Sequence, residues 1–169
     1  DASLFHPRHR KASVRGIRDD APVSALKVWT IGYERLLPDM LVAELQAAGV
    51  GRAIDVRLRP QSRRPGMSKT KLGLRLADHG IAYEHWRALG TPIEIRMLYR
   101  RGAIRSAAEA YNQHLERDAA GELEQLERAL REGPPTALLC LEAEPEHCHR
   151  RVICEALGRR RPDLEVVDL

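Results

Sequence analysis

Five short runs of mostly apolar residues follow one another along the chain, each with the length and composition of a buried strand. These predicted strands are residues 27–32, 52–56, 81–86, 136–141 and 164–169. The segments between them carry apolar residues three or four positions apart, which is the spacing of an amphipathic helix. Strands that alternate with helices predict a mostly parallel sheet with helices on both faces.

Glycine residues indicate where three of the predicted helices end. Gly49 and Gly80 each follow a helical segment and precede an apolar residue, which is the pattern of a left-handed helix cap. Gly158 is expected to close the last helix, and Ser68 is expected to cap the start of the second. Residues 94–132 form a longer helical stretch, which predicts a helical insertion before the fourth strand.

The expected fold is therefore one Rossmann-like α/β domain over residues 27–169, with about five mostly parallel strands. The run 136–141 is the most apolar strand and is expected to be central. Residues 1–26 are rich in basic side chains and have no apolar periodicity, which predicts a flexible N-terminal arm. A solvated tail is favoured over a nucleic-acid contact for this arm.

Composition adds a marked preference for arginine. The 169 residues fit one domain, and all but four of the 28 basic residues are arginine. The planar guanidinium suits phosphate and carboxylate groups, although a general compositional bias is the favoured explanation of the overall excess. No apolar run is long enough to cross a membrane, and no apolar core of a secretory signal is present, so a cytoplasmic location is expected.

Polar side chains concentrate where the predicted strands end, which is where parallel α/β sheets bind their ligands. Four arginines lie between positions 57 and 64, in a loop able to hold a phosphate group. The alternative is a solvated loop in which Arg57 pairs with Asp55 or Glu142. Because a buried carboxylate needs a partner, we expect Asp55 and Arg57 to share a pocket with Glu142 and His149.

The three cysteines do not suggest a disulfide framework, because their number is odd. Cys148 stands at the predicted start of the last helix, where the helix dipole lowers the pKa of a thiol. The alternative is structural, since Cys148 continues the apolar stripe of Val152 and Ala156. A phosphatase-type loop would need an arginine six residues after its cysteine, but Glu146 follows Cys140 and Cys154 follows Cys148 at that distance, so neither cysteine fits.

Metal and nucleotide cofactors are not predicted. Cys140, His147, Cys148 and His149 supply four candidate metal ligands, but three adjacent side chains point in different directions. Neither a GxxxxGKS/T motif nor a GxGxxG motif after the first strand is present, so P-loop hydrolysis and ordinary dinucleotide binding are unsupported.

Several short motifs occur together in a recognisable order. They are Thr30-Ile31-Gly32, Asp55-Val56-Arg57 followed by Pro60 and Ser62-Arg63, Gly80 to Tyr83, Leu89-Gly90, Leu138 to Glu142, and Cys148-His149-Arg150. Over residues 27–169 this pattern resembles a bacterial and archaeal family catalogued as domain of unknown function 488. Tyr33-Glu34 departs from the His-Ser found there in many members. The resemblance implies a cytoplasmic α/β domain with a polar site formed by these motifs, and it implies no reaction.

Two functions fit these observations. The first is an enzyme that acts on a phosphate-bearing small molecule or nucleic acid. Its candidate catalytic residues are Asp55, Glu142, Cys148 and His149, and its candidate binding residues are Tyr33, Arg57, Ser62, Arg63, Tyr83 and Arg150. The second is a non-catalytic nucleic-acid-binding module in which Cys148 and His149 are structural, with affinity that falls steeply with salt. Membrane binding is not expected, and the pattern predicts no oligomeric state.

Overall fold

The computed structural model describes residues 25–169 of the chain. The expected basic arm, up to residue 24, lies outside the described residues. Leu26, the last residue assigned to that arm, is 8% exposed and packs into the core.

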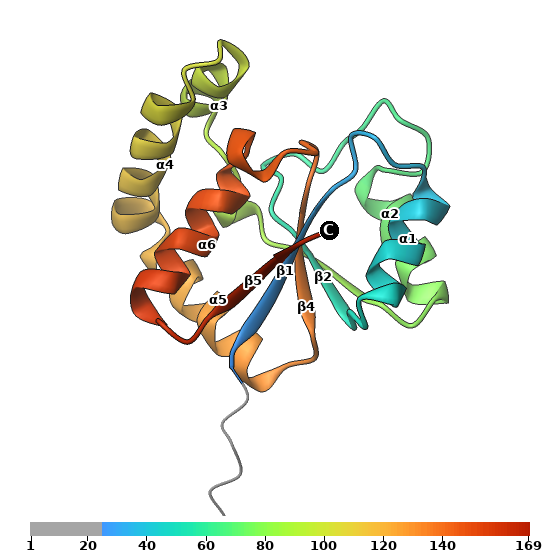
Figure 1. Cartoon of the computed structure of the whole chain (residues 1–169). Coiled ribbons are helices and arrows are strands. Elements are labelled where there is room, and N and C mark those ends of the chain that lie inside the picture. The colour runs from blue at the N-terminus through green and yellow to red at the C-terminus, as the bar shows by residue number, and fades with distance from the viewer. Residues whose placement is uncertain (1–24) are drawn as a thin grey trace, which may run out of the picture.

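A sheet of five parallel strands forms the centre of the molecule, as predicted (Figure 1). The strands are β1 (Lys27–Gly32), β2 (Arg52–Asp55), β3 (Ala82–His85), β4 (Thr136–Cys140) and β5 (Glu165–Asp168), in the spatial order β3-β2-β4-β1-β5. Every residue of β4 is buried. The prediction that the most apolar strand is central is therefore confirmed.

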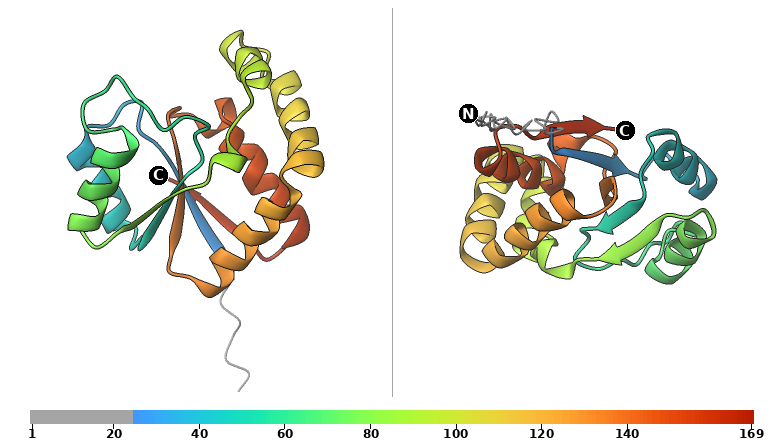
Figure 2. Two further views of the ribbon diagram at one scale, coloured as in Figure 1. Left: turned by 180° about the vertical axis from the view of Figure 1, so that it is seen from behind. Right: turned by 90° about the horizontal axis from the view of Figure 1, so that it is seen from below.

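Helices cover both faces of the sheet, and their placement follows from the strand order (Figures 1 and 2). From β1 the chain crosses to β2 and β3 on one side, and from β4 it crosses to β5 on the other. Because such crossovers are right-handed, these two sets of connections place their helices on opposite faces. One face carries α1 (Pro38–Ala47) and α2 (Lys69–Asp78), and the other carries α4 (Ile104–Asp118), α5 (Ala120–Glu132) and α6 (His149–Arg160).

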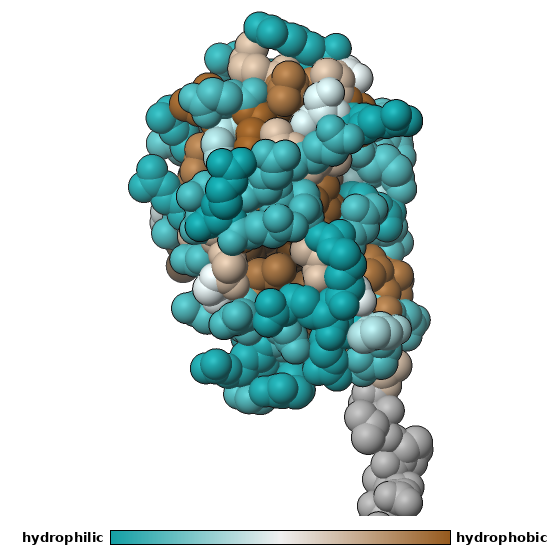
Figure 3. Space-filling model, turned by 90° about the vertical axis from the view of Figure 1, so that its left-hand side faces the viewer, coloured by the Kyte–Doolittle hydropathy of each residue, from teal (hydrophilic) through white to brown (hydrophobic). Residues whose placement is uncertain are grey.

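The helical insertion before β4 is also confirmed. It begins with α3 (Ile93–Arg100), which packs on α4 and lies beyond the carboxyl ends of the strands (Figure 1). Two short 3-10 turns, η1 (Arg87–Leu89) and η2 (Pro145–His147), complete the elements. The side of the molecule formed by the helices α3 to α6 is mostly hydrophilic, with apolar patches near its upper end (Figure 3). None of the described helices has the length and apolar character needed to cross a membrane.

Two apolar cores, one on each face, hold the layers together. Leu138 of β4 contributes to the core under α4, α5 and α6, while its neighbour Leu139 contributes to the core under α1 and α2. Successive residues of a strand point to opposite faces, so a continuous apolar run such as Thr136–Cys140 supplies both cores.

Two details of the predicted helix ends are wrong. Gly158 does not adopt the left-handed conformation of a cap, and α6 continues to Arg160. Arg160 pairs with Glu127 of α5, with 2.9 Å between Nε and Oε2. Ser68 precedes α2 but does not cap it, since its hydroxyl exchanges hydrogen bonds with the backbone of Ser62. Gly49 and Gly80 do adopt the left-handed conformation, with φ values of 71° and 74°.

The register brings the strand ends to one level. Gly32 of β1 lies opposite Cys140 of β4, and Asp55 of β2 lies opposite Leu139. The connections that follow β1 and β4 run to opposite edges of the sheet and cover opposite faces, so the switch in strand order lies between these two neighbours. This is the position at which open parallel sheets bind their ligands.

Candidate functional site

A cleft of about 600 Å³ lies at the carboxyl ends of β1, β2 and β4. Its walls come from the loops that follow these strands, from the start of α6 and from α3. Five of the predicted site residues line it, namely Tyr33, Arg57, Glu142, Cys148 and His149. The cleft therefore brings together side chains from three strand ends that are far apart in the sequence.

Cys148 occupies the position just before α6, and two basic side chains contact its sulfur. Its Sγ lies 3.7 Å from Nδ1 of His149 and 3.4 Å from Nε of Arg150. The residue is 2% exposed and lines the cleft. Burial by itself raises the pKa of the Cys148 thiol, but the Cys140 thiol and the charges of His149 and Arg150 outweigh burial and lower this pKa well below its usual range. The contacts with His149 and Arg150 therefore favour the thiolate form of Cys148.

His149 is oriented by the backbone. Its Nε2 donates a hydrogen bond of 2.9 Å to the carbonyl oxygen of Val56, which turns Nδ1 toward the sulfur of Cys148. Tyr111 packs edge-on against the ring, with 5.1 Å between centroids. Burial lowers the pKa of His149, but the negative charge of Cys148 raises it more, so the net shift is upward. This coupling favours a thiolate–imidazolium pair.

Arg150, a candidate binding residue, lies inside the protein and is not among the residues that line the cleft. It is 1% exposed, and its guanidinium donates to the Glu142 carbonyl oxygen and to the Cys148 sulfur. The reason is its place in the first turn of α6, beneath the loop that leaves β4. Arg150 therefore holds this loop and the thiolate in place and does not line the cleft.

The neighbouring Cys140 and Glu142 share a hydrogen bond. Cys140 Sγ donates to Glu142 Oε2 at 3.1 Å, and burial followed by the charge of Cys148 raises the pKa of Glu142. The pKa of the Cys140 thiol is also raised, by its contact with Cys148 and by burial. The opposite shifts of the two pKa values favour ionisation of Cys148 over ionisation of Cys140.

Some of these side chains could also serve as ligands of a soft metal. The Sγ atoms of Cys140 and Cys148 and a ring nitrogen of His149 all lie within 4.8 Å of one another. His147 is exposed and does not belong to this group. Zinc would find two sulfurs and a nitrogen here. The Arg150 guanidinium, however, already contacts the Cys148 sulfur, and a second cation beside it is electrostatically unfavourable. This arrangement favours a thiolate held by protein cations.

A buried ion pair supports the other wall of the cleft. Asp55 is fully buried and accepts hydrogen bonds from Arg57 Nε at 2.8 Å and from the Tyr83 hydroxyl at 2.5 Å. Arg57 in turn donates to the Tyr33 hydroxyl at 2.8 Å and to the Met67 carbonyl oxygen at 3.0 Å. Tyr33 and Arg57 line the cleft, whereas Asp55 and Tyr83 lie behind them. Asp55 and Tyr83 are thus positioned to orient Arg57.

The arginine-rich loop does not present a continuous basic surface. Arg57 is engaged by Asp55, and Arg64 donates to the carbonyl oxygens of Tyr33 and Leu36 at 3.1 and 2.9 Å. Arg59 lines the cleft, while Ser62 and Arg63 do not. The Ser62 hydroxyl instead accepts a hydrogen bond from the backbone of Arg64.

Three residues that line the cleft come from α3, and the sequence did not predict them as site residues. Arg96, Tyr99 and Arg100 line the side facing the strand ends, and their spacing places them on one face of the helix. The buried Tyr99 hydroxyl has no hydrogen-bond partner among residues 25–169. Within the same described region, Arg59, Arg96 and Arg100 have no carboxylate within 4.0 Å. The i, i+3, i+4 spacing was visible in the sequence, but the fold of the insertion over the strand ends was not.

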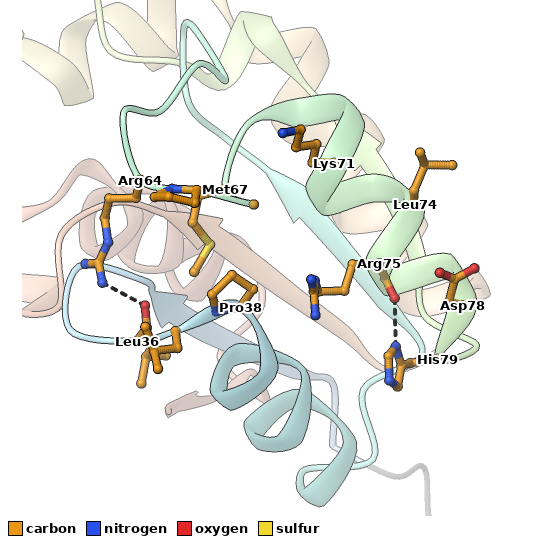
Figure 4. Close-up of a pocket in the computed structure, with 12 residues that line it drawn as sticks. Leu36, Pro38, Arg64, Met67, Lys71, Leu74, Arg75, Asp78 and His79 are labelled. Atoms are coloured by element: carbon orange, nitrogen blue, oxygen red, sulfur yellow. Dashed lines mark hydrogen bonds between the residues drawn. The ribbon is translucent and has the colours of Figure 1, made fainter.

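A second hollow, of about 700 Å³, lies between α1 and α2 (Figure 4). Its polar groups are largely satisfied by one another: Arg75 pairs with Asp39, and Arg64 and His79 bond to backbone carbonyl oxygens. Its lining side chains include no thiol or hydroxyl group. The cleft at the strand ends is therefore the better candidate for a functional site.

Comparison with known protein families gives a match. A family model with the description "Domain of unknown function DUF488" matches residues 38–157, which is more than half of the chain. This range contains Asp55, Arg57, the residues of α3 and the Cys148-His149-Arg150 triplet. No curated protein and no solved structure matches the chain.

Proposed function

The chain belongs to the family of the domain of unknown function DUF488, a description that assigns no reaction, and we propose that it is a cysteine-dependent enzyme acting on a phosphate-bearing substrate. The substrate would be a nucleotide or a nucleic-acid end. It would bind in the cleft at the strand ends, and Cys148 would be the nucleophile.

One observation carries this proposal: Cys148 lines a cleft whose arginines Arg59, Arg96 and Arg100 have no acidic partner among residues 25–169. His149 and Arg150 contact the sulfur at 3.7 and 3.4 Å. A thiolate, unlike a thiol, is a strong nucleophile, and it is activated by such cationic neighbours. The same cations would also attract an anionic group to the place where the sulfur can react.

The remaining cleft residues fit roles in binding and proton transfer. Arg59, Arg96 and Arg100 would hold phosphate oxygens, and the unpartnered Tyr99 hydroxyl would donate a hydrogen bond to the substrate. Burial raises the pKa of the Glu142 carboxyl, so Glu142 is suited to deliver a proton to a leaving group. A free Cys148 thiolate would need a reducing compartment such as the cytoplasm.

Two features favour an enzyme over a nucleic-acid-binding module. The loop expected to grip a phosphodiester backbone uses two of its four arginines, Arg57 and Arg64, for internal contacts. In addition, a merely structural Cys148 would not require contacts from two basic side chains, and burying those charges costs free energy. Binding of nucleic acid with no reaction at Cys148 would instead support the module.

Alkylation of the folded protein tests the proposal. Iodoacetamide should modify Cys148 at neutral pH, because its lowered pKa leaves the thiolate populated there. The rate should fall only as the pH drops through this lowered pKa, so its midpoint should lie below the value of about 8.5 typical of a free cysteine. Peptide mass spectrometry as a function of pH gives this midpoint.

Inorganic phosphate, nucleotides and short oligonucleotides should slow the alkylation at low salt if the cleft binds phosphate groups. Cys154 provides an internal comparison, since it is 3% exposed and does not line the cleft. If Cys148 reacts with iodoacetamide only after the protein unfolds, Cys148 is not the nucleophile of the proposed reaction. A reactive Cys148 that none of these anions protects would rule out the phosphate-bearing substrate.

A further inference from the structure

We infer that Cys140 and Cys148 form a two-cysteine centre that reduces a hydroperoxide and closes to a reversible disulfide. This activity goes beyond the proposed function. It requires a reactive Cys148, but it does not require a phosphate-bearing substrate. It uses Cys140, Cys148 and the Glu142 carboxyl of the cleft, together with a hydroperoxide as oxidant and an external thiol as reductant.

The position of the two sulfurs supports this inference. Cys140 ends β4 and Cys148 precedes α6, so a single short loop separates them in the chain. Their Sγ atoms lie within 4.8 Å of each other, and both residues line the cleft. A disulfide has an S–S distance of about 2.05 Å, so the two sulfurs have at most about 3 Å to close. Both cysteines are free in the structure.

The first chemical step uses the thiolate of Cys148. Its sulfur attacks one oxygen of the hydroperoxide, the O–O bond breaks, and the other oxygen leaves as an alcohol or water after it takes up a proton. Cys148 is thereby oxidised to a sulfenic acid, and the peroxide is reduced by two electrons. The Glu142 carboxyl, which lines the same cleft, is placed to supply the proton.

The second step uses Cys140 as the resolving thiol. Its proton passes to the Glu142 carboxylate, whose Oε2 lies 3.1 Å from Cys140 Sγ. The Cys140 sulfur then attacks Cys148 Sγ, the S–O bond breaks, and the oxygen leaves as water with a proton returned by Glu142. Two equivalents of an external thiol reduce the disulfide and restore both side chains.

Cys154 provides a matched control within the chain. It is as buried as the other two cysteines but does not line the cleft, and burial and the charge of Asp168 raise its pKa to about 12. It should therefore neither react with the peroxide nor bridge to Cys148. The Cys154→Ser variant should behave like the original protein.

The experiment treats the full chain with a small excess of hydrogen peroxide at neutral pH, followed by iodoacetamide and non-reducing peptide mass spectrometry. The expected product lacks two hydrogen atoms, contains a peptide linked through Cys140 and Cys148, and reverts with dithiothreitol. In Cys140→Ser and Cys140→Ala, both checked for folding by circular dichroism, Cys148 should instead gain oxygen atoms and reach the sulfinic acid.

Three results would overturn the inference. The first is a Cys148 in the original protein that passes to the sulfinic acid without any Cys140 link. The second is a disulfide formed through Cys154 or between two chains. The third is oxidation only after a chelator is added, which would show that the thiols hold a metal. None of these decides the proposed function, which depends on protection of Cys148 from iodoacetamide by phosphate or nucleotides.

Discussion

Replacing Asp55 with alanine is expected to lower the free energy of unfolding by about 3–5 kcal/mol. The Asp55 carboxylate is fully buried and binds the equally buried Arg57 through two nitrogens, with the closest pair at 2.5 Å. Alanine would leave the Arg57 guanidinium charged and without its partner inside the protein. Urea denaturation followed by circular dichroism measures the loss.

The control for this variant is an exposed ion pair in the same domain. Asp39 of α1 pairs with Arg75 of α2, but its side chain is 83% exposed, so Asp39→Ala should change stability very little. A loss for Asp55→Ala no larger than for Asp39→Ala would show that the Asp55–Arg57 pair does not support the cleft wall.

Replacing Gly32 with alanine is expected to have an effect of similar size, and one that reaches the candidate site. A Cβ atom at Gly32 would lie 1.7 Å from the carbonyl oxygen of Glu142. This oxygen belongs to the backbone and accepts a hydrogen bond from Arg150, which also holds the Cys148 sulfur. The loop after β4 would have to move, at a cost of about 3 kcal/mol, and Cys148 would lose its reactivity.

Thermal unfolding and the iodoacetamide rate at Cys148 together test the Gly32 prediction. Gly121 of α5 offers the matched control, because a Cβ atom there meets nothing within 4 Å. Gly121→Ala should keep Cys148 reactive and raise stability slightly, since alanine is the better helix former. Normal stability and normal reactivity in Gly32→Ala would contradict the packing of β1 against the loop after β4.

The architecture was predictable because local and global signals agree. Continuous apolar runs gave the five strands, and the length and apolar character of Thr136–Cys140 placed it at the centre. The same reasoning located the strand ends as the site and brought Arg57, Glu142 and Cys148 into one cleft. Gly158 was misread because a glycine near the end of a helix pattern resembles a cap whether or not the chain turns there.

The details of the site depend on contacts that no local pattern encodes. Nothing around Arg150 distinguishes a buried arginine that binds a carbonyl oxygen from one that faces a ligand. Likewise, the spacing of Arg96 and Arg100 defines a helix face, but only the packing of α3 on α4 turns this face toward the strand ends. Whether each of these side chains faces the cleft therefore depends on tertiary packing and not on its neighbours in the sequence.

The central claim is that Cys148 is a reachable thiolate in a cleft that prefers anions, and charge-selective alkylation tests it most directly. The measurement is the ratio of the rate constants for iodoacetate, an anion, and iodoacetamide, its neutral counterpart, at Cys148 in low salt. We predict that this ratio is about tenfold higher in the folded protein than in urea. Arg96→Gln or Arg100→Gln should lower the ratio in the folded protein. Arg101→Gln should leave it unchanged, because Arg101 does not line the cleft. A folded protein with the same ratio as the unfolded chain, or with an unreactive Cys148, would contradict the account.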